Sequence, residues 1–260
     1  MGGSGTPLWL LVVFVVAVAI LVAVGSILLA NRILSAVGKE HNSTVSPFIT
    51  VVGLVYGALL GFTVVVSWQQ FSSAAAVVAN EASTLTTMYG QTVAMPEPEQ
   101  TQMRQLLRQY ASAVAGPEWD KQGSGGTGDG GRNAITGMYR IIGSQPPSVA
   151  SSPINGAFLN QLSVLASDRS TRIIDAKPRI PPLLFAALIF GGTVLVALTG
   201  FLRLGSTIGH AIVSSTIAVL LGLLLCIVFS LDHPFGSERG ITAAPFQHAL
   251  EVFDAVDRGT

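Results

Sequence analysis

Residues 47–70 read PFITVVGLVYGALLGFTVVVSWQQ, a stretch without a charged side chain. A helix advances about 1.5 Å per residue, so about 20 apolar residues cross a hydrocarbon core of roughly 30 Å. A helix also pairs most of its backbone polar groups within the segment, which lipid requires. The stretch therefore predicts a transmembrane helix, and Trp68 near its end suits the level of the lipid headgroups.

Three further runs have a similar length and also lack charge. They are residues 7–30, 181–202 and 207–231, the last with its most apolar part from Ala211 to Leu231. The first run exceeds the apolar core of a signal peptide and no Lys or Arg precedes it, so we expect it to remain as a membrane helix. Only 11% of the 260 residues are charged, which is too few to cover a soluble globule. The predicted fold class is all-α, a polytopic membrane protein with four transmembrane helices.

The region between the second and third spans is polar enough to leave the membrane, and its apolar residues recur at helical spacing. We expect a helical extramembrane insert there, whose first helix continues the second span and buries Val78, Ala82, Leu85 and Tyr89. The chain then divides into four parts: a hairpin with helices 7–30 and 47–70 (residues 1–71), the insert (72–179), a second hairpin (180–231) and a C-terminal tail (232–260).

A glycine-rich segment, residues 123–131, interrupts the insert. Gly123, Gly125 and Gly128 have the spacing of a dinucleotide-binding loop, but that loop follows a strand, whereas this segment follows a predicted helix. We interpret the segment as a flexible linker. The helix before it is predicted to stop at Gly116-Pro117, and the helix after it to begin with Asn133 as its N-cap.

The tail contains a short amphipathic helix whose apolar face holds Phe246, Ala249, Leu250 and Phe253. Four crossings place the tail and the insert on the same side of the membrane, so we expect this face to dock on the insert. Basic residues flank the spans on both sides, including Arg169 and Arg172 before the third span. Their counts nearly cancel, so the sidedness of the termini stays unresolved.

The sequence contains no zinc-protease H-E-x-x-H, no G-x-S-x-G, no P-loop and no paired-cysteine motif, and the four histidines are scattered. We therefore expect no enzyme, no cofactor and no metal site. Cys226 is the single cysteine, so the chain cannot form an internal disulfide or a thiolate metal site. Basic and acidic residues are equal in number, 14 each, so the charge balance does not indicate nucleic acid as a partner.

The second span carries the candidate functional residues. Gly53, Gly57 and Gly61 recur at four-residue intervals, which predicts a helix-packing face. The other faces offer hydroxyl groups and rings that could line an uncharged pathway for ions, namely Phe48, Tyr56, Thr63 and Ser67. The cores of all four spans lack Asp, Glu, Lys and Arg, which coupled transporters use at membrane depth, so the pattern favours passive conduction.

Two stretches resemble the bacterial bestrophin-like domain family. The first runs from His41 through the second span to Phe71, and on through Met95-Pro96-Glu97-Pro98-Glu99 to Trp119. The second is the tail, in which Asp232, Pro234 and Phe235 match the closing signature of the family. This resemblance implies distant similarity to bestrophins, which are pentameric anion channels whose second helix lines a hydrophobic neck.

The leading hypothesis is a homo-oligomeric, passive ion channel of the plasma membrane. The resemblance to bestrophins implies that the conducted ions are anions. One protomer of four helices has little room for an aqueous pore, so conduction would need several copies around an axis. The alternative is a non-conducting scaffold or sensor whose insert binds a partner protein through its amphipathic helices. A carrier is disfavoured because the chain has neither an internal repeat nor a charge within its spans. The lipid bilayer is the expected environment in every case.

Overall fold

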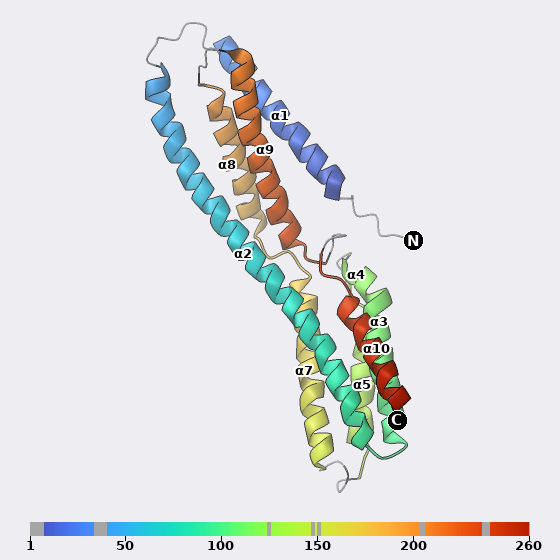
Figure 1. The fold of residues 1–260 in the computed structure, drawn as a ribbon. Coiled ribbons are helices and arrows are strands. Elements are labelled where there is room, and N and C mark those ends of the chain that lie inside the picture. The colour runs from blue at the N-terminus through green and yellow to red at the C-terminus, as the bar shows by residue number, and fades with distance from the viewer. Residues whose placement is uncertain are drawn as a thin grey trace. The chain divides into compact units, whose positions relative to one another are not determined.

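The computed structural model describes residues 8–33, 41–123, 126–146, 149, 152–202, 206–235 and 240–259. Over this part of the chain every regular element is a helix and no strand occurs, which confirms the predicted all-α class. The elements follow in the order α1 (Leu8–Ile33), α2 (His41–Gln91), a 3₁₀ turn (Thr92–Ala94), α3 (Glu99–Ala113), a π turn (Val114–Glu118), α4 (Trp119–Gly123), α5 (Gly130–Gly143), α7 (Pro153–Asp175), α8 (Pro182–Thr199), α9 (Thr207–Asp232) and α10 (Ala244–Gly259) (Figure 1).

The chain divides into two units, and each is described by itself. The apolar unit comprises the described residues of 5–70 and 178–232, with α1, the first part of α2, α8 and α9. The polar unit comprises the described residues of 71–177 and 233–260, with the rest of α2, α3, α4, α5, α7 and α10. The tail thus belongs to the same unit as the region between the second and third apolar helices.

Four helices are long and apolar enough to cross a membrane, namely α1, α2, α8 and α9. Each overlaps most of one of the four uncharged runs, so the prediction of four such helices is confirmed by length and composition for the described residues. The bounds differ most for α2, which begins at His41 and ends only at Gln91. This length agrees with the expectation that the second helix continues beyond its apolar run.

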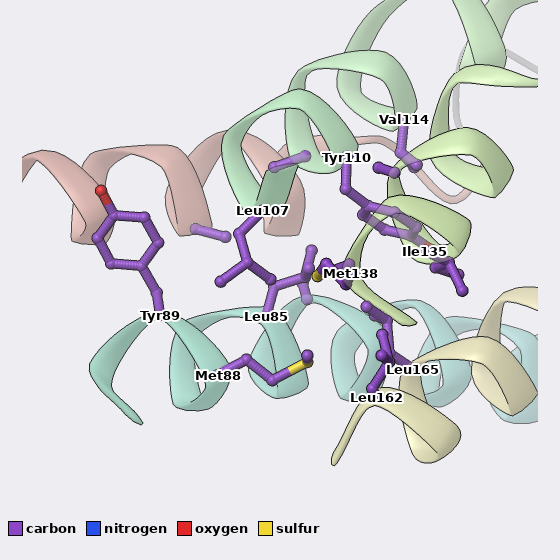
Figure 2. Close-up of a cluster of buried hydrophobic side chains, with 14 of the residues drawn as sticks. Leu85, Met88, Tyr89, Leu107, Tyr110, Val114, Ile135, Met138, Leu162 and Leu165 are labelled. Carbon is purple, nitrogen blue, oxygen red and sulfur yellow. The ribbon is translucent and has the colours of Figure 1, made fainter. Parts of the chain in front are cut away.

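The core of the polar unit forms where α2, α3, α5, α7 and α10 pack together (Figure 2). The predicted stripe on α2 is confirmed, because Val78, Ala82, Leu85 and Tyr89 are all buried. Figure 2 shows Leu85 and Leu107 pointing toward one another, with Met138 beside them. Full burial of a leucine or methionine side chain stabilises a fold by about 1.5–3 kcal/mol.

Of two predicted helix ends in this unit, one is wrong. Asn133 is not the N-cap of α5: the helix begins at Gly130, and the Asn133 N–H already donates to the carbonyl of Asp129 over 2.8 Å. The helix begins earlier because glycines at 130 and 131 allow its first turn to approach neighbouring side chains closely. The predicted end of the preceding helix is confirmed, because α3 ends at Ala113 and the backbone of Gly116 is non-helical, with φ −127° and ψ −105°, in the π turn that separates α3 from α4.

The predicted docking of the tail helix is confirmed. Phe246, Ala249 and Phe253 of α10 are buried in the core of the polar unit. The ring of Phe253 stacks on that of Tyr89 with 4.0 Å between centroids. Arg108 of α3 also forms ion pairs with two aspartates of α10, so both apolar and charged contacts hold the helix in place.

Candidate functional site

Helix α2 has two different faces within the apolar unit. Its covered face consists of Tyr56, Leu60, Thr63 and Ser67, which are all at most 6% exposed. Their spacing of four, three and four residues keeps them on one side of the helix. Three of the four predicted lining residues therefore lie on the face that packs within the protomer.

Tyr56 joins α2 to α8. Its hydroxyl donates to the carbonyl oxygen of Leu188 over 2.9 Å. The ring lies against two glycines of α8: an added Cβ would come within 2.7 Å of the Tyr56 hydroxyl at Gly192 and within 3.0 Å of its ring at Gly191. Glycine at these two positions is what lets the tyrosine approach the α8 backbone.

Thr63 and Ser67 differ in how their hydroxyl groups are satisfied. The Thr63 hydroxyl donates to the carbonyl of Leu59 on its own helix over 2.8 Å. The Ser67 hydroxyl oxygen is buried and has no hydrogen-bond partner within the described part of the chain. A hydroxyl left without a partner in an apolar site costs free energy, so Ser67 is not explained by packing alone.

The opposite face of α2 is open and apolar. Leu54, Ala58 and Phe62 follow one another at four-residue intervals, and all three are exposed, Leu54 by 73% and Phe62 by 69%. Phe48, near the start of the helix, is exposed by 70%. Phe48 is thus the one predicted lining residue that the apolar unit leaves uncovered.

The three predicted packing glycines of α2 have different surroundings. A Cβ at Gly53 would make ordinary contact with Leu195 of α8, 3.7 Å away. Cβ atoms at Gly57 and Gly61 would meet no atom within 4 Å. Of these three glycines, Gly53 is therefore the one that faces another helix within the described part of the protomer.

The predicted tail residues have positioning roles at the end of α9 and beyond it. One carboxylate oxygen of Asp232 accepts hydrogen bonds from the backbone N–H groups of Arg179 and Ile180, over 2.9 and 3.0 Å. In the polar unit, the Pro234 carbonyl accepts from the Ile241 N–H, and the Phe235 ring packs against Trp119 edge to face. Asp232 thereby links the end of α9 to the residues that lead into α8.

A buried charged network, which the sequence did not predict, lies in the polar unit. Glu81 of α2 accepts from the Arg172 guanidinium of α7 over 2.7 Å and from the Tyr110 hydroxyl of α3 over 2.5 Å. Arg172 also donates to the side-chain oxygen of Gln122. Burial and then the nearby Glu81 carboxylate raise the pKa of Tyr110 well above its ordinary value, so the hydroxyl remains a donor.

A second ion pair completes the network. Arg169, one helical turn before Arg172, donates to Glu118 over 2.6 Å and to the carbonyl of Gly128 over 2.9 Å. The other Glu118 oxygen accepts from the Gly131 N–H over 2.7 Å, at the start of α5. Burial alone would raise the pKa of Glu118, but the hydrogen bonds from Arg169 and Gly131 outweigh it, and the pKa lies below its ordinary value.

The glycine-rich segment, which was predicted to be a flexible linker, makes close contacts in its described part. Ser124 and Gly125 lie outside the described residues, but Gly128, Gly130 and Gly131 pack closely. An added Cβ would collide with Glu118 at Gly128 and with Arg169 at Gly131. At the start of α5 the Gly131 N–H donates to the Glu118 carboxylate, which is a favourable place for an anion because helix N-termini carry unpaired N–H groups.

The described residues include no group of three or more His, Cys, Asp or Glu side chains placed to hold a metal ion. His41 and His210 instead contact backbone carbonyls near the end of α8, Phe201 over 3.0 Å and Thr199 over 2.9 Å. These two histidines have structural roles at one end of the apolar unit.

One family matches the chain. A family model described as the Bestrophin-like domain matches residues 7–246. No curated protein matches the chain. A single-residue variant of a bacterial bestrophin homologue from Klebsiella pneumoniae has a similar structure, with a TM-score of 0.74 at 14% identity over 95% of this chain and 98% of that one.

Two further solved structures give the same result. Another structure of the Klebsiella pneumoniae homologue has a TM-score of 0.72 at 15% identity, over 93% of this chain and 98% of that one. A structure described as a membrane protein has a TM-score of 0.73 at 14% identity, over 93% and 97% of the two chains. At these identities the likeness establishes the fold.

Proposed function

The chain belongs to the bestrophin-like family, and from this premise we propose that it is a homo-oligomeric, passive ion channel of the plasma membrane. The helix nearest the pore axis is α2. The four apolar helices α1, α2, α8 and α9 span the bilayer. The polar unit, with the insert of residues 72–179 and the tail, lies outside the bilayer on one side.

The observation that carries this proposal is the open face of α2. Leu54, Ala58 and Phe62 are exposed in the protomer, carry no charge and repeat along one side of the helix. Several copies around an axis could direct this face toward a shared centre. Ions pass such an apolar constriction when it is hydrated, and the constriction closes when it loses water.

The predicted lining residues fit this proposal in two groups. Phe48 lines the pathway near one end of α2. Tyr56, Thr63 and Ser67 support the lining from behind, because they face the helices of their own protomer. The Tyr56 hydrogen bond to α8 then fixes which side of α2 is turned to the axis.

The preference for anions is proposed from the resemblance to bestrophins. The proposed lining carries neither positive nor negative charge, so it does not exclude ions of either sign by strong fixed fields. Selectivity would instead depend on how readily an ion gives up hydration water. Large, weakly hydrated anions should therefore pass more easily than small, strongly hydrated ones.

The test is ion flux through purified full-length protein in liposomes. We expect flux without a coupled ion gradient, and reversal potentials under asymmetric KCl that report the preference for chloride. Phe62→Ala should change the flux severalfold, because it alters the proposed constriction. The matched control is Phe190→Ala on α8, which removes the same ring from a side chain that is 71% exposed.

Absence of flux at every voltage and pH tried would contradict the channel proposal, provided that the protein is incorporated and folded. An equal effect of Phe62→Ala and Phe190→Ala would contradict the proposal that α2 lies nearest the pore axis.

The scaffold hypothesis has lost part of its support, since the amphipathic stripes of the polar unit pack on one another and on α10. Recovery of a stoichiometric foreign protein from native membranes would favour it.

A further inference from the structure

Helix α2 begins in the apolar unit and ends in the polar unit, as one helix of 51 residues. Its rotation about its own axis decides which of its side chains are covered, because successive residues of a helix differ in direction by about 100°. Glu81 follows Tyr56 by about seven turns, so the two side chains lie on the same side of the helix. Both are covered, since Tyr56 is 6% exposed and Glu81 is 0% exposed.

The apolar pattern of α2 does not fix this rotation near the place where the apolar unit ends. Residues 74–79 are Ala or Val at every position, and six consecutive residues point to all sides of a helix. Residues 51–66 contain no charged side chain that would have to stay uncovered. Over these turns a rotated α2 would bury a similar amount of hydrocarbon. The rotation must therefore be set by contacts that have a direction, such as hydrogen bonds.

The Glu81 carboxylate makes contacts of this kind with two other helices. The Nε and Nη2 groups of Arg172 in α7 donate to its two oxygens over 2.7 and 3.1 Å. The Tyr110 hydroxyl in α3 donates to the carboxylate over 2.5 Å. A group at the rim of a helix lies about 5–6 Å from the axis, so a rotation of about 30° would move the carboxylate by about 3 Å. Such a displacement breaks all three hydrogen bonds.

Stability alone does not account for a charged pair at this position. Burial of two charges costs free energy, and apolar side chains of similar volume often stabilise a fold equally well. A buried pair does distinguish one arrangement of helices from others, because any other rotation of α2 leaves Glu81 without Arg172. The polar unit contains a second buried pair, Glu118 and Arg169, and neither of these residues belongs to α2. The two pairs can therefore be compared.

We propose that Glu81 and Arg172 are positioning residues that fix the rotation of α2 about its axis. They act together with the Tyr56 hydrogen bond to α8, which holds the same side of α2 in the apolar unit. The rotation keeps Phe62 open and Thr63 covered. Its consequence for ions rests on the proposed function, in which the open side of α2 lines the pathway, whereas the rotation itself is measured without any ion flux.

The test reads the rotation from nitroxide spin labels on the full-length protein in liposomes, with Cys226→Ser to remove the native thiol. Labels at Phe62→Cys and Thr63→Cys report the two sides of α2, because these neighbouring side chains are 69% and 6% exposed. We expect the label at position 63 to have a severalfold longer rotational correlation time than the label at position 62. In the variant with both Glu81→Leu and Arg172→Leu, this ratio should fall severalfold toward one, since α2 then adopts several rotations.

The matched control is the variant with both Glu118→Leu and Arg169→Leu. It removes the other buried pair of the polar unit without touching α2, so the ratio should stay as in the natural chain. If the variant of Glu81 and Arg172 does not fold, Glu81→Met with Arg172→Met takes its place, because methionine is closer in length to the natural side chains.

An unchanged ratio without Glu81 and Arg172 would overturn the proposal, because Tyr56 and Tyr89 would then suffice to hold α2. An equal fall of the ratio in the control would also overturn it, since general loosening of the polar unit would explain both results. A changed ratio together with no ion flux in the natural chain would overturn only the channel proposal. If the natural chain conducts, a changed ratio with unchanged flux would overturn the link between this rotation and the pathway.

Discussion

The Nε atom of Arg172 lies 2.7 Å from a carboxylate oxygen of Glu81, although the two residues are 91 positions apart and their side chains are 1% and 0% exposed. The contact joins α7 to α2 inside the core of the polar unit. The Arg172 guanidinium also lies 5.8 Å from the ring centre of Trp119 and 5.7 Å from that of Phe246. A buried pair of this kind is costly to desolvate, but losing one partner costs more.

Arg172→Leu should therefore destabilise the polar unit strongly. Among the described residues the substitution leaves the buried Glu81 carboxylate with the Tyr110 hydroxyl as its remaining donor, and the expected loss is about 3–5 kcal/mol. Hydrogen exchange of the backbone amides in α3 and α7, measured at increasing temperature, would report this loss of stability. Arg132→Leu is the control, because the Arg132–Asp129 pair is exposed at the surface and should contribute little.

The double variant Glu81→Leu with Arg172→Leu separates charge from packing. It removes both charges and should recover part of the stability that Arg172→Leu loses. If the double variant loses more unfolding free energy than the two single variants lose together, the destabilisation does not come from an unpaired buried charge.

The apolar helices were predictable because length and composition suffice for them. Residues 47–70 contain no charge, and α2 does run through them without interruption. The stripe from Val78 to Tyr89 was also predictable, because burial every three or four residues is a local property of the chain. Both inferences need no knowledge of which segments meet in space.

The charged network was missed because its members look like surface residues when taken one at a time. Glu81 falls between Val78 and Leu85 on the buried stripe, and Arg169 and Arg172 continue the stripe of Leu162 and Leu165 on α7. That register was the available signal. The pairing itself depends on contacts between distant segments, which helical spacing alone does not reveal.

The assignment of faces on α2 also needed the structure. The sequence allowed Tyr56 to line a pathway, but Gly191 and Gly192, more than 130 residues later, form the surface that receives its ring. The glycine-rich segment is a similar case, because its partner Glu118 is supplied by the turn before α4. Composition predicted a flexible linker, and the close contacts at Gly128, Gly130 and Gly131 give a second physical reason for glycine there.

Acid should weaken the polar unit through Glu118. Its pKa is lower in the folded chain, so its stabilising contribution is complete above the ordinary glutamate pKa of about 4.3 and is lost as pH falls through the folded value. Thermal midpoints measured from pH 6 to pH 3 should fall more steeply for the natural chain than for Glu118→Gln. Parallel curves for the two proteins would contradict this role of Glu118.

Glycine-to-alanine substitutions should separate close packing from flexibility. Gly128→Ala places a methyl group on the Glu118 side chain and should destabilise the polar unit by about 1–3 kcal/mol. Gly156→Ala in α7 meets no atom within 4 Å and should be neutral or stabilising by up to about 1 kcal/mol. Equal and small effects, seen in chemical or thermal unfolding, would mean that the segment is the flexible linker its composition indicates.

Gly57 and Gly61 test whether copies of the chain meet along α2. Neither glycine faces an atom of its own protomer within 4 Å, so a larger side chain is tolerated there unless another chain approaches. We expect Gly61→Leu to shift the particle mass in detergent toward the monomer, because small residues allow close contact between membrane helices. Gly25→Leu on α1 is the matched control, since that glycine is also free of contacts within 4 Å and should leave the mass unchanged. An unchanged oligomer in Gly61→Leu would remove this face of α2 from the contact between copies, and the lining proposed for Leu54 and Phe62 would then need a different arrangement of subunits.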